Sequence, residues 1–195
     1  MQVLSRAQLK KSMALYTGKG DEGTTKTIDT PERISKNSTT PEALGNLDEL
    51  NSFLGLVKVK AKESGFKILD QSFENIVESI QQNIFTISAG LAGGDKSIDE
   101  EKISEIEVLI GEAEKELPPI TKFTIAGGTE LASLFDFART LARRSERRVV
   151  AVNDEKGNIS ADTLKYLNRL SSILFALARL TNQKSGIKED SPSYN

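Results

Sequence analysis

Hydrophobic residues recur at the spacing of an amphipathic helix in five segments of the chain. At about 69–92 they fall within a narrow arc on a helical wheel of about 100° per residue, and this stripe consists of Phe73, Ile76, Ile80, Ile84, Ile87 and Leu91. Similar stripes predict helices at about 41–63, 98–117, 129–152 and 160–182. We therefore expect an all-α five-helix bundle.

Polar residues and prolines mark where some of these helices begin and end. Thr40 can cap the first helix, with Pro41 at the favoured first position. Ser97 followed by Glu100 has the spacing of a capping box, which predicts the start of the third helix. The prolines at 118–119 end that helix, because proline lacks the amide hydrogen that a helix interior needs.

Two segments have no helical pattern. One covers residues 16–38, which are rich in Gly, Thr, Asp and Lys, and the other covers residues 118–128. Only residues 123–125 resemble a strand. A loop longer than about 15 residues in a compact domain is usually functional or disordered. We expect a single domain at 16–183, a flexible N-terminus at 1–15 and a polar tail at 184–195.

The composition restricts the chemistry that the chain can perform. Its 195 residues include no cysteine and no histidine, and the formal net charge is −2. This excludes thiolate nucleophiles, disulfides, and mechanisms in which histidine acts as a base or a metal ligand. No apolar run approaches the roughly 18 residues of a membrane span, and no secretory signal is visible. We expect a cytoplasmic protein that does not bind membranes.

The fourth predicted helix carries five arginines within ten positions, at 139–148, with Glu146 among them. Arg139, Arg143 and Arg147 recur every four residues, so three positive charges lie along one side of the helix. Like charges at this spacing destabilise a helix by roughly 0.2–0.5 kcal/mol per pair unless an anion compensates them. Arginine rather than lysine favours carboxylate or phosphate partners, because the planar guanidinium binds them through two hydrogen bonds.

This basic face has two interpretations: a solvated surface with ordinary ion pairs, or a site for a polyphosphate. Asp48 offers an internal partner for one arginine, within the chain or across a subunit boundary. The segment at 16–25 favours a polyphosphate site, because its glycines let backbone amides approach an anion and its threonines add hydroxyl groups. Such a turn is also typical of a hairpin or flexible arm. It is not a Walker loop, which ends in Gly-Lys-Ser/Thr before a helix.

Together these motifs resemble those of the trimeric, five-helix ATP:cob(I)alamin adenosyltransferases. The similarity spans roughly residues 16–180 and includes, in the family's order, YTGKGDEGTT, RISK, ALGNLDELNSFLGL, GGTELA, ARTLARRSERRVV and YLNRLSSILFALAR. It implies transfer of the 5'-deoxyadenosyl group of ATP to Co(I) of a reduced corrinoid, with triphosphate as the leaving group. Co(I) is itself a strong nucleophile, which agrees with a chain that has no histidine and no cysteine.

The resemblance also implies a set of site residues. The ATP site would lie between adjacent subunits of a homotrimer, with the N-terminal loop over the nucleotide. Its residues would be Thr17, Gly18, Lys19, Gly20, Asp21, Gly23, Thr24, Thr25, Arg33, Lys36, Arg139, Arg143, Glu146 and Asn168. The residues implied in catalysis are Arg139, Arg143, Glu146 and Asp48, which would pair with Arg139. Mg²⁺ would be held mainly by the ATP phosphates, with Glu146 as a candidate ligand. Phe123 would press on the lower face of the corrin and displace its axial base.

Two positions depart from the family's pattern. Lys19 follows Gly18, whereas many relatives have the basic residue one position earlier, and Ala126 replaces the proline of the family's PGG. A reductase that delivers Co(I) and an acceptor enzyme that uses adenosylcobalamin are further implied partners.

One rival function is a nucleic-acid or polyanion-binding module, which the negative net charge and the absence of aromatic residues among the arginines disfavour. Another is a different ATP-dependent transferase on the same bundle.

Overall fold

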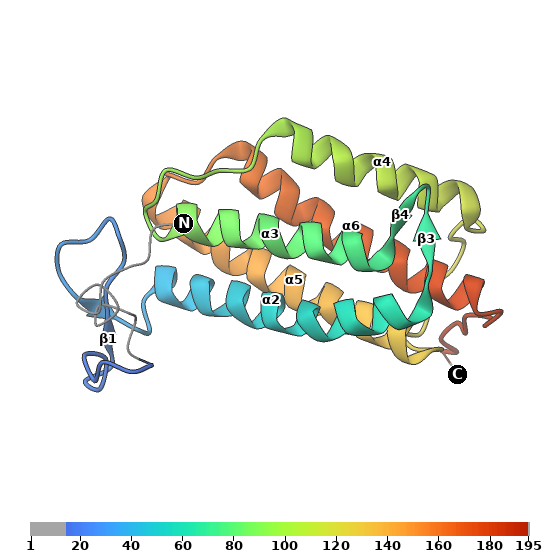
Figure 1. The fold of residues 1–195 in the computed structure, drawn as a ribbon, viewed down its shortest axis with the longest axis horizontal. Coiled ribbons are helices and arrows are strands. Elements are labelled where there is room, and N and C mark those ends of the chain that lie inside the picture. The colour runs from blue at the N-terminus through green and yellow to red at the C-terminus, as the bar shows by residue number, and fades with distance from the viewer. Residues whose placement is uncertain (1–14, 195) are drawn as a thin grey trace, which may run out of the picture.

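Helices form most of the chain in the computed structural model, which describes residues 15–194 (Figure 1). The five helices are α2 at Thr39–Ser64, α3 at Phe73–Leu91, α4 at Glu100–Glu116, α5 at Glu130–Lys156 and α6 at Ala161–Lys184. Two short antiparallel hairpins pair β1 (Thr24–Thr25) with β2 (Ile34–Ser35), and β3 (Lys67–Ile68) with β4 (Gln71–Ser72). The predicted five-helix architecture is confirmed, whereas residues 1–14 of the expected flexible N-terminus lie outside the described residues.

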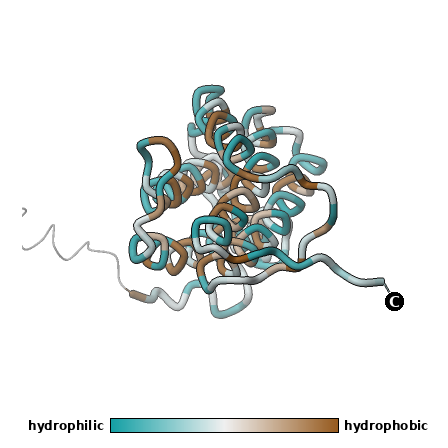
Figure 2. Tube along the Cα trace, turned by 90° about the vertical axis from the view of Figure 1, so that its right-hand side faces the viewer, coloured by the Kyte–Doolittle hydropathy of each residue, from teal (hydrophilic) through white to brown (hydrophobic). Residues whose placement is uncertain are grey.

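The helices lie side by side along the length of the molecule (Figure 1). α2 packs between α3 and α5, α5 packs against α6, and α6 also contacts α4. The predicted stripes form the core: the whole α3 stripe is buried, as are Leu47, Leu50, Leu54 and Val57 of α2 and Leu167, Leu170, Leu174 and Leu177 of α6. Viewed nearly along the bundle, each helix carries both hydrophobic and hydrophilic positions (Figure 2).

The predicted caps of α2 and α4 are each wrong by two residues, because α2 is capped at Ser38 and α4 at Asp99. Thr40 and Pro41 both lie inside the first turn of α2, where proline is tolerated because the first amides of a helix have no helical acceptor. α4 is capped by Asp99 rather than Ser97. The Asp99 carboxylate accepts a hydrogen bond from the Lys102 amide at 3.1 Å, and its negative charge is also favoured at a helix N-terminus.

The predicted start of the second helix is wrong as well. Residues 69–72 form the turn and the second strand of the β3–β4 hairpin, in which Leu69 has a φ of 51°. α3 begins only after Ser72, whose side chain accepts a hydrogen bond from the Asn75 amide at 3.1 Å. The strand-like segment at 123–125 forms no strand, although the Ile125 amide donates a backbone hydrogen bond to the Asp190 carbonyl oxygen.

The last two helices are longer than predicted. α5 continues past position 152 to Lys156 and ends where Gly157 takes a φ of 64°, a left-handed conformation that glycine adopts readily. α6 continues past position 182 to Lys184. Within residues 15–194, none of the helices has the combination of length and apolar character that a membrane span requires.

A buried polar pair joins α3 to α6. The Asn83 side chain donates a hydrogen bond to the hydroxyl oxygen of Tyr166 at 3.0 Å, and the Tyr166 side chain is fully buried. Burial raises the pKa of the Tyr166 hydroxyl above its ordinary value, because the charged phenolate is poorly solvated there. Burial thus favours the neutral hydroxyl, which can accept the hydrogen bond from Asn83.

We expect Phe135→Ala to destabilise the bundle by about 3–5 kcal/mol, the usual cost of deleting a buried phenylalanine side chain. Phe135 is fully buried, and its ring meets Phe73 edge to face at a centroid distance of 6.1 Å. The free energy of unfolding in urea measures the loss. Phe85→Ala removes the same ring from a site that is 62% exposed, so an equal loss in both variants would contradict this account of the core.

Candidate functional site

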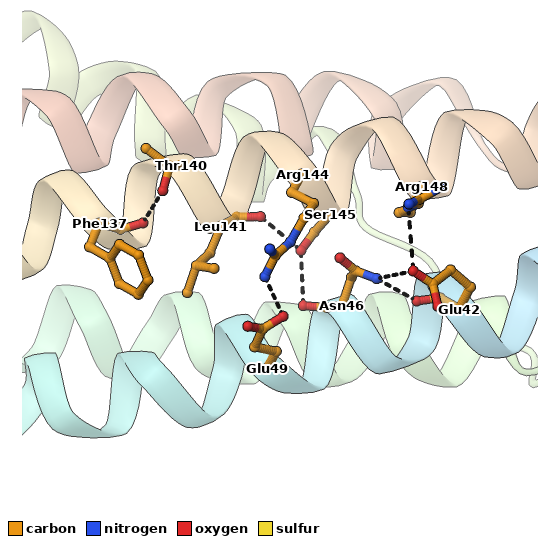
Figure 3. Close-up of polar contacts among 9 residues, drawn as sticks. All are labelled: Glu42, Asn46, Glu49, Phe137, Thr140, Leu141, Arg144, Ser145 and Arg148. Carbon is orange, nitrogen blue, oxygen red and sulfur yellow. Dashed lines mark hydrogen bonds and ion pairs between the residues drawn. The ribbon is translucent and has the colours of Figure 1, made fainter.

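The five arginines of α5 divide between two sides of the helix. Arg144 forms an ion pair with Glu49 of α2, and Nε of Arg148 lies 3.5 Å from Oε1 of Glu42 (Figure 3). Between them, the Ser145 hydroxyl donates a hydrogen bond to a backbone carbonyl oxygen of α2 at 3.0 Å. These contacts fasten α5 to α2, so the arginines on this side stabilise the bundle.

A cavity of about 420 Å³ lies on another side of α5, against α6. Its lining includes Arg143, Glu146, Arg147, Asp154 and Asn168. Oε1 of Glu146 accepts a hydrogen bond from Nδ2 of Asn168 at 3.0 Å, so two of the predicted site residues meet. The cavity thus combines guanidinium groups, which suit phosphate oxygens, with carboxylates, which suit a hard cation.

A second cavity, of about 380 Å³, also lies along α5 and α6. The loop at 118–128 contributes Phe123, α5 contributes Arg139 and Arg143, and α6 contributes Phe175. The Phe123 side chain is 79% exposed, and Ile120 and Ile125 of the same loop are also exposed, so the loop presents a group of apolar side chains of the kind that marks binding sites. Arg143 lines both cavities, so one guanidinium group connects them.

Arg139 lies where the loop at 118–128 meets α5. Its Nε is 3.5 Å from Oδ1 of Asp136 and is buried without a hydrogen-bond partner among the described residues. Its guanidinium carbon lies 5.7 Å from the centroid of the Phe175 ring. The other Asp136 oxygen accepts a hydrogen bond from the Gly127 amide at 3.4 Å. Asp136 therefore links the loop to Arg139, whose side chain is 29% exposed and lines the second cavity.

The predicted nucleotide loop is folded around its own hairpin. Nε of Arg33 donates a hydrogen bond to Oγ1 of Thr24 at 2.8 Å, so this arginine holds β1. A Cβ added at Gly20 would lie 2.9 Å from Nζ of Lys36, which means that the ammonium group sits directly against the backbone of the loop. Two predicted site residues, Lys36 and Gly20, are therefore neighbours.

This loop lies at one end of the bundle, whereas the loop at 118–128 lies at the other (Figure 1). The remaining predicted loop residues are exposed or partly buried; they are Thr17, Gly18, Lys19, Asp21, Gly23 and Thr25. Within residues 15–194, no hydrogen bond or ion pair joins this loop to Arg139, Arg143, Glu146 or Asn168. A single chain therefore does not bring the two halves of the predicted ATP site together.

The predicted pair of Asp48 and Arg139 is absent within one chain. Asp48 is exposed on α2 and forms no ion pair with any described residue. The flank that it shares with Asn51 faces α3, because Nε2 of Gln81 donates a hydrogen bond to the Asn51 carbonyl oxygen at 2.9 Å. α3 rather than α5 approaches this flank, and a pair across a subunit boundary stays a prediction.

Three polar residues that form hydrogen bonds to the loop at 118–128 were missed by the sequence analysis. Asp136 stands three positions before Arg139, a spacing that brings opposite charges together on a helix and could have identified it. Arg179 interrupts the apolar end of α6 and is 7% exposed, and such an arginine needs a partner. Asn182, at 4% exposure, gave no signal in the sequence because its partners lie more than fifty positions away.

Fold and site define a class of protein, a five-helix bundle with an arginine-lined site between α5 and α6. The family described as cobalamin adenosyltransferase matches residues 15–181. The corrinoid adenosyltransferase of Bacillus subtilis is 39% identical over 180 residues, covering 90% of each chain. PduO of Salmonella typhimurium, also a corrinoid adenosyltransferase, is 39% identical over 193 residues, which are 93% of this chain. The chain spans 55% of the length of that relative.

Solved structures agree with these sequence relatives. A variant of the PduO-type ATP:corrinoid adenosyltransferase from Lactobacillus reuteri, complexed with cobalamin and ATP, superposes with a TM-score of 0.81 at 33% identity. The match covers 93% of this chain and 97% of that chain. This chain therefore belongs to the cobalamin adenosyltransferase family.

Proposed function

We propose that this protein transfers the 5'-deoxyadenosyl group of ATP to Co(I) of a reduced corrinoid. The electron pair of cobalt forms the new bond to C5'. The bond between C5' and oxygen breaks, and triphosphate leaves with the two electrons of that broken bond. The observation that carries the proposal is the position of Arg143, which lines both cavities between α5 and α6. One guanidinium group can thus face the leaving triphosphate at the junction with the corrinoid.

The cavity of Glu146 and Asn168 is the nucleotide half of the proposed site. Arg139 and Arg143 would hold phosphate oxygens, and the Asn168 carboxamide already orients Glu146 through their 3.0 Å hydrogen bond. The glycine-rich loop, with its backbone amides, threonines, Lys19, Arg33 and Lys36, would close over the nucleotide. The protein's contribution is then positioning and the stabilisation of negative charge, because Co(I) supplies the nucleophile.

Mg²⁺ belongs to this proposal as a partner of the ATP phosphates. Within residues 15–194, no group of three or more acidic side chains is arranged to hold a metal ion. The carboxylates of Glu146 and Asp154 line the nucleotide cavity, so they fit a role beside a cation that the phosphates mainly bind. The ion would neutralise charge on the triphosphate as it leaves.

A homotrimer with sites between subunits is the proposed assembly. The loop at 16–38 is separated from the arginine cavity in one chain, and Asp48 is exposed and forms no ion pair with any described residue. Apolar residues on α2 and α5 are exposed, among them Leu56 at 49% and Phe137 at 54%. A neighbouring subunit could cover these residues and bring Asp48 to Arg139.

Asp48→Asn is expected to weaken the assembly or ATP binding at least about tenfold, because truncating one partner of a buried charge pair between subunits costs roughly 2–5 kcal/mol. Sedimentation velocity across a concentration series reports the assembly, and KM reports the nucleotide. Asp70→Asn, at an exposed aspartate of the β3–β4 turn, is the matched control. Wild-type sedimentation and wild-type KM for Asp48→Asn would make this residue incidental.

The transfer itself is tested anaerobically with chemically reduced cobalamin, Mg²⁺ and ATP. We expect loss of the Co(I) absorbance together with release of one triphosphate per cobalamin. ATP binding without transfer would favour another ATP-dependent transferase, and binding of polyanions without selectivity for ATP would favour the non-enzymatic module. Omitting Mg²⁺ tests the metal separately.

The wider setting of the reaction is part of the same proposal. A reductase would deliver the corrinoid as Co(I), and an adenosylcobalamin-dependent enzyme would accept the product, because free Co(I) and the Co–C bond are both reactive. We propose residues 16–183 as the catalytic domain, and a cytoplasmic location stays a prediction.

A further inference from the structure

The loop at 118–128 presents apolar side chains to the surface. Ile120, Phe123 and Ile125 are 61%, 79% and 56% exposed. A segment whose apolar side chains are exposed gains little stability from their burial. Its conformation must therefore depend on other contacts, and two buried polar residues of α6, Arg179 and Asn182, supply them.

Arg179 holds the beginning of the loop. Its Nη2 donates a hydrogen bond to the carbonyl oxygen of Pro118 at 3.3 Å, and its Nε lies 2.9 Å from Oε2 of Glu189. The guanidinium group is only 7% exposed and the Glu189 side chain only 19%. A charge buried this far must remain paired, so Arg179 ties the first residue of the loop to the C-terminal segment.

Asn182, one turn later on α6, holds the end of the loop. Its Nδ2 donates a hydrogen bond to the Gly127 carbonyl oxygen at 2.8 Å, and its Oδ1 accepts one from the Thr129 amide at 3.1 Å. A Cβ added at Gly128 would lie 2.4 Å from that Oδ1. Only glycine fits between the carboxamide and the loop, which makes this contact specific.

The C-terminal segment completes the attachment. The sequence predicts residues 184–195 as a polar tail, yet the Asp190 carbonyl oxygen accepts a hydrogen bond from the Ile125 amide at 2.8 Å. The Ile187 amide donates to the Asn182 carbonyl oxygen at 2.9 Å. Arg179 and Asn182 thus each hold both the loop and the segment that supports its middle.

We propose that Arg179 and Asn182 are positioning residues for the corrinoid, and that residues 186–190 are part of the same device. These residues hold the loop at 118–128 so that Phe123 keeps a fixed position at the second cavity. This inference rests on the proposed function. It predicts a larger effect on the corrinoid than on ATP, because the lining of the nucleotide cavity at Glu146 and Asn168 includes none of these residues and the loop reaches the ATP-binding arginines only indirectly, through Asp136 and Arg139.

The test compares three variants with wild type in the Co(I) assay. Asn182→Asp cannot donate to Gly127, Glu189→Gln removes the charge that pairs with Arg179, and Gly128→Ala forces the loop away from an intact Asn182. We expect each to raise KM for cob(I)alamin about 10- to 100-fold, since small misplacement of a reacting group has costs of this order. KM for ATP should rise several-fold less than KM for cob(I)alamin, because the loop reaches Arg139 only through Asp136.

Asn153→Asp is the matched control. Asn153 also anchors a connection, because its Oδ1 accepts a hydrogen bond from the Ile159 amide at 3.2 Å, but it lies at the other end of the bundle. It should leave both KM values unchanged. Absorbance of cob(II)alamin bound with ATP gives a second reading, in which the three loop variants should lose the spectral change caused by removal of the axial base.

The outcomes separate the two hypotheses. A wild-type protein that consumes no Co(I) overturns the proposed function. Wild-type transfer with an unchanged corrinoid KM in folded Asn182→Asp or Gly128→Ala overturns the positioning role alone. An equal rise of both KM values would also overturn it, because a general loss of structure does not distinguish the two substrates. Thermal melting identifies any variant that fails to fold, and the remaining variants then decide.

Discussion

Arg143→Ala will reduce adenosyl transfer at least about 10²- to 10³-fold, the usual loss when one donor that stabilises transition-state charge is removed. Arg143 lines both cavities, and within residues 15–194 its guanidinium group forms no ion pair or hydrogen bond. Nothing in the bundle depends on this exposed side chain, so the fold should survive its removal. The Co(I) assay measures the loss, and circular dichroism on heating verifies the fold.

Arg148→Ala is the control for Arg143→Ala on the same helix. Arg148 pairs with Glu42, and the two side chains are 52% and 44% exposed, so the pair should contribute no more than about 1 kcal/mol. We expect transfer within about twofold of wild type in this variant. Similar losses in both would assign the effect to the total charge of α5, and unchanged turnover in Arg143→Ala would remove Arg143 from the mechanism.

Helix α5 shows how much of the structure can be predicted from the sequence. Phe135, Ala138 and Leu141 recur at helical spacing in the sequence of α5, and all three lie in the core. The recurrence of Arg139 and Arg143 every four residues placed both beside the second cavity. These successes have one cause: helical periodicity is a local property, so neighbours along the chain suffice to determine which side of α5 each residue occupies.

Contacts between distant segments could not be predicted in this way. Asn182 meets Gly127 across fifty-five positions, and the pair of Asp48 and Arg139, which is absent within one chain, stays a prediction across a subunit boundary. The caps failed for a different reason, since Ser97 and Asp99 are both good N-cap residues and the local sequence does not choose between them. Periodicity determines on which side of a helix a residue lies, whereas the tertiary structure determines which residue it contacts there.

The same distinction applies to Phe123. As a hydrophobic residue before a turn it would be assigned to a core, yet its side chain is 79% exposed beside Arg139 and Arg143. The resemblance gave it a role that periodicity could not. Because it is exposed, its removal should leave folding unchanged, so its function can be measured without interference from a loss of stability.

Phe123→Ala is expected to weaken corrinoid capture by about 1.5–3 kcal/mol, the value of burying one large apolar side chain, or about 10- to 150-fold. A larger loss should appear when the reaction starts from cob(II)alamin with a mild reductant. The ring is proposed to exclude the axial base, and four-coordinate Co(II) is easier to reduce. The reaction started from cob(I)alamin bypasses this step, so the ratio of the two rates isolates it.

Ile125→Ala provides the control within the same loop. Its side chain is 56% exposed, and its amide still donates to Asp190 after the substitution. It should therefore preserve the ratio of the two rates. If Phe123→Ala lowers both rates by the same factor, the ring acts in binding alone and the removal of the axial base must have another cause. If only the cob(II)alamin reaction falls, the ring acts on the coordination of cobalt, which a chain without histidine controls by excluding ligands rather than by supplying one.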